Sequence, residues 1–248
     1  CNNRCRVCAI TNAMRRDRGV MTMETFKRIV AELPEGIKKV YLFKQGEPFI
    51  NKSLEAFATY LREQRPGVYI SIHTNGILAE KARAEKILPL IDALGISVGA
   101  MSRETYKRVH QTDSFDKVMA NIKGISDAAL SLPRDKRPHI FIDYVQQQAN
   151  SEEKEADVVS FFRNSFPGLS SVDFHWVFNF QGEIAEGNMK VYENIEQQNF
   201  PCCVFPWSAV TFCYDGRVSY CFVEPRENRF LGDINAQSFQ EIWNGEEY

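Results

Sequence analysis

The amino-acid sequence predicts an α/β fold with a parallel sheet, followed by a small β-hairpin that carries cysteines. Short β-branched runs alternate with amphipathic segments between residues 23 and 178, a pattern typical of a parallel sheet covered by helices. After Phe180 the sequence becomes polar and acidic, and residues 201–248 are compact and rich in turn residues. Within this last stretch Asp215-Gly216 separates two apolar runs, which is a strong hairpin signal.

The expected elements follow one another as helix and strand. The first helix, over 23–33, places Phe26, Ile29, Val30 and Leu33 on one stripe. Further helices are expected at 54–65, 80–94, in several segments over 103–130, and at 152–166. Strands are expected at 38–44, 68–74, 95–98, 139–145 and 172–178. Because parallel sheets carry their chemistry at the carboxyl ends of the strands, the site is expected there.

Composition excludes several classes of protein. Of the 248 residues 44% are hydrophobic and 25% charged, which excludes a disordered chain, a collagen-like repeat and a coiled coil. The net charge of −2 argues against nonspecific binding to nucleic acid or anionic membrane. No run of 18 apolar residues is present, so no helix is expected to span a bilayer. The chain starts at Cys1 rather than Met, so we expect a fragment with an unseen beginning.

Seven cysteines occur in two groups at the two ends of the chain. They are Cys1, Cys5 and Cys8, then Cys202, Cys203, Cys213 and Cys221. An odd number with this spacing fits metal or redox use in a reducing compartment better than a secreted disulfide framework. We therefore expect a cytoplasmic protein.

The first group has the spacing C-x3-C-x2-C. Three thiolates are too few to close a tetrahedral structural zinc site, but on one loop they suit a [4Fe–4S] cluster with one open iron. The alternative is three unrelated cysteines or an incomplete zinc site.

With this group the sequence resembles the radical S-adenosylmethionine (SAM) superfamily. Further matches are Gly46-Glu47-Pro48, preceded by Gln45 where the family carries glycine, Thr74-Asn75-Gly76, and Ser97 at a strand end. The resemblance implies a partial (β/α)6 TIM-like barrel whose first strand would precede Cys1. It also implies that Cys1, Cys5 and Cys8 hold the SAM-binding [4Fe–4S] cluster. The residues implied to contact SAM are Gly46, Glu47, Pro48, Thr74, Asn75, Ser97, Arg108 or His110, and more weakly Asn150.

The second group resembles the auxiliary-cluster module of SPASM and twitch proteins. Twelve residues separate Cys203 from Gly216 and four separate Gly216 from Cys221, as in the module's C-x(9–15)-G-x4-C pattern. The hairpin can bring Cys203 and Cys221 together at its base, where two thiolates can share a metal, and the resemblance implies that this metal is an auxiliary [4Fe–4S] cluster. Cys202 could replace Cys203, and Cys213 could be a core residue. The open alternative is a zinc ribbon or buried thiols.

The resemblance implies an enzyme that reductively cleaves SAM and removes a hydrogen atom from its substrate. Such an oxidoreductase or maturase would take electrons from flavodoxin or ferredoxin and act on a peptide or small molecule. Near the end of the last strand, His175, Trp176, Asn179 and Glu183 could line the substrate side, although aromatic residues there often belong to the core. The competing hypotheses are a non-catalytic iron–sulfur electron carrier and a zinc-binding interaction module.

Three domains are expected from these patterns. Residues 1–180 form the partial barrel, 181–200 a connector, and 201–248 the auxiliary-cluster module, whose remaining ligands are expected beyond Tyr248.

Overall fold

The computed structural model describes residues 1–12, 18–178, 180, 183–185 and 203–247. The chain divides into two compact units. The first comprises Cys1–Arg6 and Gly36–Trp176, and the second comprises Val7–Glu35 and Val177–Tyr248.

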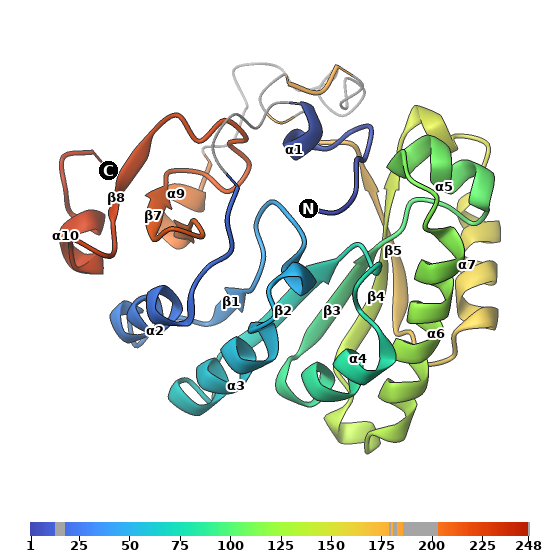
Figure 1. Cartoon of the computed structure of the whole chain (residues 1–248), viewed down its shortest axis with the longest axis horizontal. Helices are drawn as coiled ribbons and strands as arrows, with labels where there is room; N and C mark the ends of the chain where they lie inside the picture. Colours follow the sequence, from blue (N-terminus) through green and yellow to red (C-terminus); the bar gives the residue numbers. More distant parts are fainter. Residues whose placement is uncertain (13–17, 179, 181–182, 186–202, 248) are drawn as a thin grey trace. The chain divides into compact units, whose positions relative to one another are not determined.

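The first unit is built on a five-stranded parallel sheet (Figure 1). Its strands are β1 (Lys39–Tyr41), β2 (Tyr69–Thr74), β3 (Ala93–Ser97), β4 (His139–Gln146) and β5 (Ser171–Trp176). Each strand pairs with the next one along the chain, so the order is β1-β2-β3-β4-β5. This arrangement confirms the predicted α/β barrel-like architecture, whereas the strand expected before Cys1 stays a prediction.

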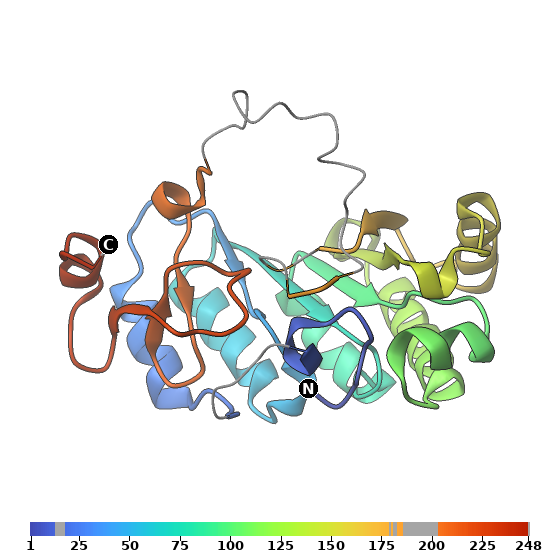
Figure 2. The same cartoon turned by 90° about the horizontal axis from the view of Figure 1, so that it is seen from above.

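Helices of this unit follow one another along one side of the sheet, as Figures 1 and 2 show. They are α3 (Leu54–Gln64), α4 (Lys81–Ile87), α5 (Arg103–His110), α6 (Phe115–Ser131) and α7 (Glu155–Ser165). Four short 3-10 turns complete the unit: η1 (Pro48–Ile50), η2 (Leu88–Leu90), η3 (Arg134–Lys136) and η4 (Gln148–Asn150). Ser102 caps α5 by accepting a hydrogen bond from the backbone N–H of Thr105, as polar residues do at helix starts.

The predicted helix over 80–94 is wrong at its carboxyl end. The α-helix stops at Ile87, η2 follows, and strand β3 already begins at Ala93. Pro89 has no N–H with which to continue the helix. The Asp92 carboxylate accepts a hydrogen bond of 2.7 Å from the backbone N–H of Ile70, which ties this segment to β2.

The two faces of the sheet differ in their side chains. Along β4, Ile140, Ile142 and Tyr144 are buried while Phe141 and Asp143 are only half-buried. Because side chains alternate between faces of a strand, the apolar set packs on one face and Asp143 lies on the other. We call the face that carries Asp143 the inner face. β4 pairs with both β3 and β5, so residues from these strands share that face.

The second unit contains a three-stranded antiparallel sheet, β6 (Thr211–Phe212), β7 (Arg217–Ser219) and β8 (Phe230–Asp233). Its helices within the described residues are α1 (Ala9–Asn12), α2 (Met23–Glu32), α9 (Phe205–Ser208) and α10 (Phe239–Trp243). Gly216 has a φ of 93° at the turn between β6 and β7, a conformation that favours glycine. The predicted hairpin is thus confirmed, and β8 extends it by a strand that the sequence pattern did not predict. No helix within the described ranges is long and apolar enough to cross a membrane.

Candidate functional site

The carboxylate of Glu47 joins the loop after β1 to the end of β2. Its Oε1 accepts hydrogen bonds from the Thr74 hydroxyl (2.7 Å) and the Phe49 backbone N–H (3.0 Å). Its Oε2 accepts one from the Asn75 backbone N–H at 2.7 Å. Burial raises the pKa of Glu47, while the bonds from Asn75, Thr74 and Phe49 lower it in part. The structure therefore brings together two motifs that the sequence carries separately.

The neighbouring motif residues have distinct local roles. Gly46 has a φ of 130° and is exposed, and no atom lies within 4 Å of the position of a Cβ. Pro48 begins the turn η1, where its missing N–H is not needed. Gly76 has a φ of 77° directly after Asn75. Two glycines with left-handed φ values thus give the backbone of both loops an unusual path.

Asn75 links the Glu47 loop to the first cysteine. The Asn75 side-chain nitrogen lies 3.7 Å from the sulfur of Cys1 and donates to Oδ1 of Asn2 at 2.7 Å. The Asn75 oxygen accepts from the backbone N–H of Ile77 at 3.0 Å. The amide is thus oriented by its own turn, with its N–H groups directed to the cysteine segment.

Cys5 lies against the carboxyl end of α5. The backbone N–H groups of Arg4 and Arg6 donate to the carbonyls of His110 (3.3 Å) and Val109 (3.0 Å). Carbonyls in the last turn of a helix have no partner within the helix, so the cysteine segment satisfies them. The Cys5 sulfur then lies 3.1 Å from Nδ1 of His110.

His110 is buried, with 5% of its surface exposed. Burial lowers the pKa of His110 to about 4, so the ring is neutral near pH 7 and carries one hydrogen. The Gly99 backbone N–H donates to Nε2 at 3.4 Å. Besides the Cys5 sulfur, the Asn3 side-chain nitrogen contacts Nδ1 at 3.3 Å. The predicted contact of His110 with SAM stays a prediction, and both ring nitrogens already have neighbours within the protein.

Arg108, the other predicted contact of the SAM carboxylate, is half-buried. Its Nε donates to the Ala149 carbonyl at 3.1 Å. Its guanidinium pairs with Glu152 and, at 3.5 Å, with Glu104. It lines a small cavity of about 230 Å³ together with Gln111.

Asn150 is buried and holds two loops together. Its side-chain nitrogen donates to the carbonyls of Gly99 (3.0 Å) and Val145 (2.9 Å). Its side-chain oxygen accepts from the backbone N–H of Gln147 at 2.8 Å. All three polar positions of the amide are therefore used within the protein.

A polar cluster that the sequence analysis did not predict as a group lies on the inner face, and two of its members, Asp143 and His73, were not predicted as site residues. We call it the Asp143 cluster, and it consists of Asp143, Ser97, His73 and His175. The Ser97 hydroxyl donates to Asp143 at 3.2 Å. The ring nitrogens of His73 and His175 lie 3.6 Å and 3.5 Å from the Asp143 carboxylate. Asp143 was visible as a polar residue inside a β-branched run, but its partners depend on the strand order.

The ring of His73 is held by aromatic neighbours. It stacks on Phe43 with ring centroids 4.4 Å apart and meets Phe141 edge-on at 5.2 Å. A Cβ at Gly95 would lie 2.9 Å from the His73 ring and 2.8 Å from Phe141. The glycine inside β3 is thus what lets both rings approach the sheet.

The four residues predicted to line the substrate side are divided. His175 belongs to the Asp143 cluster, and Trp176 is 56% exposed, so it is not a core residue. Glu183 lies in the second unit and pairs with Arg226. Asn179 lies outside the described residues, as does Cys202.

The second cysteine group lies entirely in the second unit. Cys203 is exposed and Cys221 half-buried. The rings of Phe205 and Phe222, each within two residues of one of these cysteines, have centroids 5.0 Å apart, so the two segments lie side by side. Cys213 is buried, and its sulfur donates to Oε1 of Glu227 at 3.4 Å.

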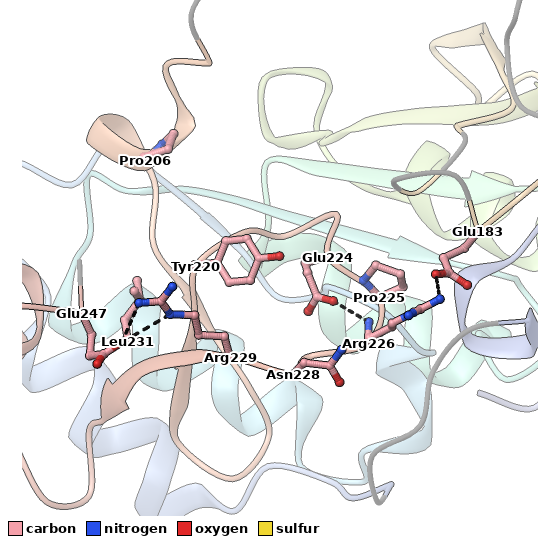
Figure 3. Close-up of a pocket in the computed structure, with 10 residues that line it drawn as sticks. All are labelled: Glu183, Pro206, Tyr220, Glu224, Pro225, Arg226, Asn228, Arg229, Leu231 and Glu247. Atoms are coloured by element: carbon pink, nitrogen blue, oxygen red, sulfur yellow. Dashed lines mark hydrogen bonds and ion pairs between the residues drawn. The ribbon is translucent and has the colours of Figure 1, made fainter.

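A cavity of about 800 Å³ borders these two segments (Figure 3). Pro206, three residues after Cys203, and Tyr220, directly before Cys221, both line it. Figure 3 shows two ion pairs along its wall, between Arg226 and Glu183 and between Arg229 and Glu247. The cavity thus combines charged pairs with the backbone that carries the two cysteines.

Cys8 belongs to the second unit, which begins at Val7. Its backbone carbonyl accepts a hydrogen bond of 2.8 Å from the side-chain nitrogen of Asn12. In the part of the chain that the structure describes, no three His, Cys, Asp or Glu side chains gather around a point that could hold one metal ion. A cluster spreads its thiolate ligands over several irons, so this finding concerns mononuclear sites.

Two family models match the chain. The model of the radical SAM superfamily matches residues 1–131, which is more than half of the sequence. The model of the SPASM iron–sulfur cluster-binding domain matches residues 202–248.

Curated relatives are GTP 3',8-cyclases. That of Aliarcobacter butzleri is 24% identical over 243 residues, which cover 95% of this chain and 72% of the relative. That of Chlorobaculum tepidum is 26% identical over 119 residues, which cover 48% of this chain and only 36% of the relative.

Solved structures share the fold. The structure of anSMEcpe with bound AdoMet has a TM-score of 0.67 at 17% identity, covering all of this chain and 78% of that one. SuiB bound to its precursor peptide SuiA has a TM-score of 0.71 at 14% identity, covering 99% and 62%. BtrN in complex with AdoMet and 2-DOIA has a TM-score of 0.63 at 18% identity, covering 100% and 79%.

Motifs, fold and family matches agree. The chain therefore belongs to the radical SAM superfamily as an enzyme with a SPASM domain, and its cofactors are a SAM-binding [4Fe–4S] cluster and an auxiliary iron–sulfur cluster.

Proposed function

We propose that this protein reductively cleaves SAM at a cluster held by Cys1, Cys5 and Cys8 and removes a hydrogen atom from a polar substrate. The observation that carries the proposal is that Asn75, from a SAM motif, directs its side-chain nitrogen at the Cys1 sulfur. The motifs proposed for the cluster and for SAM therefore meet in the first unit.

The donor chemistry of the first unit fits such a cluster. Thiolates are the preferred soft ligands of iron–sulfur clusters, and N–H groups near their sulfurs can hold and tune them. Cys1 and Cys5 each have a nitrogen of Asn75 or His110 within 3.7 Å. When bound, the cluster supplies the electron that breaks the sulfonium bond of SAM.

The chain's own residues would position SAM around the Glu47 carboxylate. Glu47 holds its own loop through the N–H of Phe49 and the end of β2 through Thr74 and Asn75. Carbonyls of this loop can accept hydrogen bonds from an ammonium group. Of the two residues predicted for the SAM carboxylate, Arg108 is proposed, because both ring nitrogens of His110 have neighbours within the protein. Ser97 is proposed for the ribose or carboxylate of SAM.

Cys203 and Cys221 are proposed as ligands of the auxiliary cluster, within a C-terminal module of residues 201–248. The packing of Phe205 on Phe222 supports this pairing. Residues 1–180 and 181–200 are proposed as barrel domain and connector, and most of the connector lies outside the described residues. A cytoplasmic flavodoxin or ferredoxin is the proposed reductant.

Anaerobic reconstitution tests the reaction. The protein should bind iron and sulfide and release 5′-deoxyadenosine from SAM when dithionite is added. Cys5→Ser should abolish this release, whereas Cys213→Ser is the matched control because Cys213 contacts Glu227 in the second unit. Full release of 5′-deoxyadenosine by Cys5→Ser, or a protein that binds only zinc, would overturn the proposal and favour the electron-carrier or zinc-module hypothesis.

The inner face is proposed as the substrate side. The Asp143 cluster offers a carboxylate, a hydroxyl and two imidazoles, which suit the hydroxyl and amine groups of a peptide or small molecule. GTP is a second candidate, favoured by the relative in Aliarcobacter butzleri that matches 95% of this chain.

Substrate-dependent SAM cleavage separates the two candidates. GTP, a short peptide containing Cys and Ser, and 2-DOIA would each be added to the reduced enzyme. If the substrate is a peptide or a small molecule of the first candidate class, the peptide or 2-DOIA should stimulate 5′-deoxyadenosine formation. Asp143→Asn should lose this stimulation but keep the rate of SAM cleavage measured without substrate. Stimulation by GTP alone would favour the second candidate.

A further inference from the structure

We propose that His110 is a positioning residue for the N-terminal cluster, because its Nδ1–H donates a hydrogen bond to the Cys5 thiolate. The inference rests on the proposed ligand role of Cys5. It gives His110 a role toward the cluster sulfur rather than toward SAM.

The contact is built by backbone and side chains together. The hydrogen bonds from Arg4 and Arg6 to the last carbonyls of α5 hold the peptide on both sides of Cys5. His110, the last residue of that helix, then has its Nδ1 3.1 Å from the sulfur. Because the ring is buried, water does not compete for this nitrogen.

The neighbours of the ring assign its hydrogen. The Gly99 N–H points at Nε2, so Nε2 accepts and the ring hydrogen lies on Nδ1. Nδ1 faces two atoms, the Asn3 side-chain nitrogen and the Cys5 sulfur. The Asn3 nitrogen is itself a donor, and the ring can accept from only one of Gly99 and Asn3. The backbone N–H of Gly99 has a fixed direction, whereas the Asn3 amide can turn its hydrogens away from the ring, so we assign the ring hydrogen to Nδ1. Only the sulfur can accept, and it is also the nearer atom.

Electrostatics make this donor important. The carboxyl end of a helix carries a partial negative charge, which disfavours a thiolate next to α5. An N–H directed at the sulfur offsets that field. Reduction of a cluster adds negative charge to its sulfurs and strengthens such a bond, so the donor raises the reduction potential.

The aromatic setting provides a clean variant. Tyr106 lies against His110 with ring centroids 4.3 Å apart, and phenylalanine can keep this contact without a donor. Asparagine places an N–H close to the position of Nδ1. His139, an exposed histidine on β4 that contacts Ser171, gives the matched control His139→Phe.

The experiment compares His110→Phe, His110→Asn and His139→Phe in the full chain carrying Cys203→Ser and Cys221→Ser. These two substitutions remove the proposed ligands of the auxiliary cluster, so the measured iron and potential belong to the N-terminal cluster alone. For each protein we would measure the iron content and use circular dichroism to check folding. The midpoint potential of the cluster would be measured without SAM in a redox titration followed by electron paramagnetic resonance.

We expect His110→Phe to shift the midpoint potential to a more negative value. His110→Asn should restore it toward that of the parent, and His139→Phe should leave it unchanged. Loss of iron from folded His110→Phe, with retention by His110→Asn, would equally support the donor role. An unchanged potential in iron-loaded His110→Phe, or equal effects of the Phe and Asn variants, would overturn it. Cys5→Ser that retains all its iron would instead count against the proposed ligand role.

Discussion

The hydroxyl of Thr74 donates a hydrogen bond of 2.7 Å to Oε1 of Glu47, although the two residues are 27 positions apart in the chain. Together with the bond from the Asn75 N–H, it fastens the loop after β1 to the carboxyl end of β2. The carboxylate is buried and accepts three hydrogen bonds, so it acts as the structural centre of the proposed SAM site.

Replacement of Glu47 by alanine should therefore destabilise the first unit. The N–H of Phe49, the hydroxyl of Thr74 and the N–H of Asn75 would lose their acceptor. Phe49 and Thr74 are buried and Asn75 is half-buried, and each buried group left unsatisfied costs about 1–3 kcal/mol. The free energy of unfolding, measured by urea denaturation, should fall by at least one such amount. Glu63→Ala, on the exposed side of α3, is the control and should stay within about 0.5 kcal/mol of the parent. Equal stabilities of the two variants would contradict the role of Glu47.

Much of this arrangement could be predicted from sequence because the motifs follow strand ends. Glu47 comes after β1 and Thr74 ends β2, and neighbouring parallel strands bring their carboxyl ends to one edge. The direction of His110 could not be predicted in the same way. Helical periodicity does not tell whether a polar residue in the last turn faces solvent or a distant segment, and here the partner is Cys5, 105 positions away.

The Asp143 cluster shows a second limit of the sequence. Asp143 stands at a polar position of an alternating strand, but its partners come from β2, β3 and β5. Only the strand order and register bring them to one place. Gly95 carried a signal that was overlooked, because glycine inside a strand often marks a close approach of other groups.

Replacement of Gly95 by alanine should disturb this inner face. The new Cβ would lie 2.8 Å from Phe141 and 2.9 Å from the His73 ring, distances at which the rings must move. Overpacking of this kind costs about 1–3 kcal/mol, which should appear as a lower midpoint of thermal unfolding. At Gly67 no atom lies within 4 Å of the added Cβ, so Gly67→Ala is the matched control. A Gly95→Ala protein as stable as Gly67→Ala would show that the rings do not pack as described.

Replacement of Asn150 by aspartate should be more harmful than its small change in shape suggests. The Asn150 nitrogen donates to the carbonyls of Gly99 and Val145, and a carboxylate oxygen there would face two acceptors in a buried site. We expect a loss of more than about 2 kcal/mol, as for a buried polar group without a partner. Asn164 is an exposed residue of α7, so Asn164→Asp is the control for the added charge. Chemical denaturation near pH 7 measures both, and a loss shared equally by the two variants would assign the effect to net charge.

Removal of the proposed auxiliary ligands should separate the two iron–sulfur sites. Cys203 and Cys221 lie far along the chain from Cys1, Cys5 and Cys8, and none of these three is replaced in the double variant. The double variant Cys203→Ser/Cys221→Ser should lose the iron of the auxiliary site, which amounts to about four irons per chain when that site holds a complete [4Fe–4S] cluster. It should still release 5′-deoxyadenosine from SAM on reduction, because the N-terminal site is untouched. Cys213→Ser should keep all its iron, since Cys213 is bonded to Glu227 within the core of the second unit. Colorimetric analysis measures the iron content of each protein, and chromatography measures the 5′-deoxyadenosine that it releases. Iron loss by Cys213→Ser equal to that of the double variant would move the auxiliary site to a different set of cysteines.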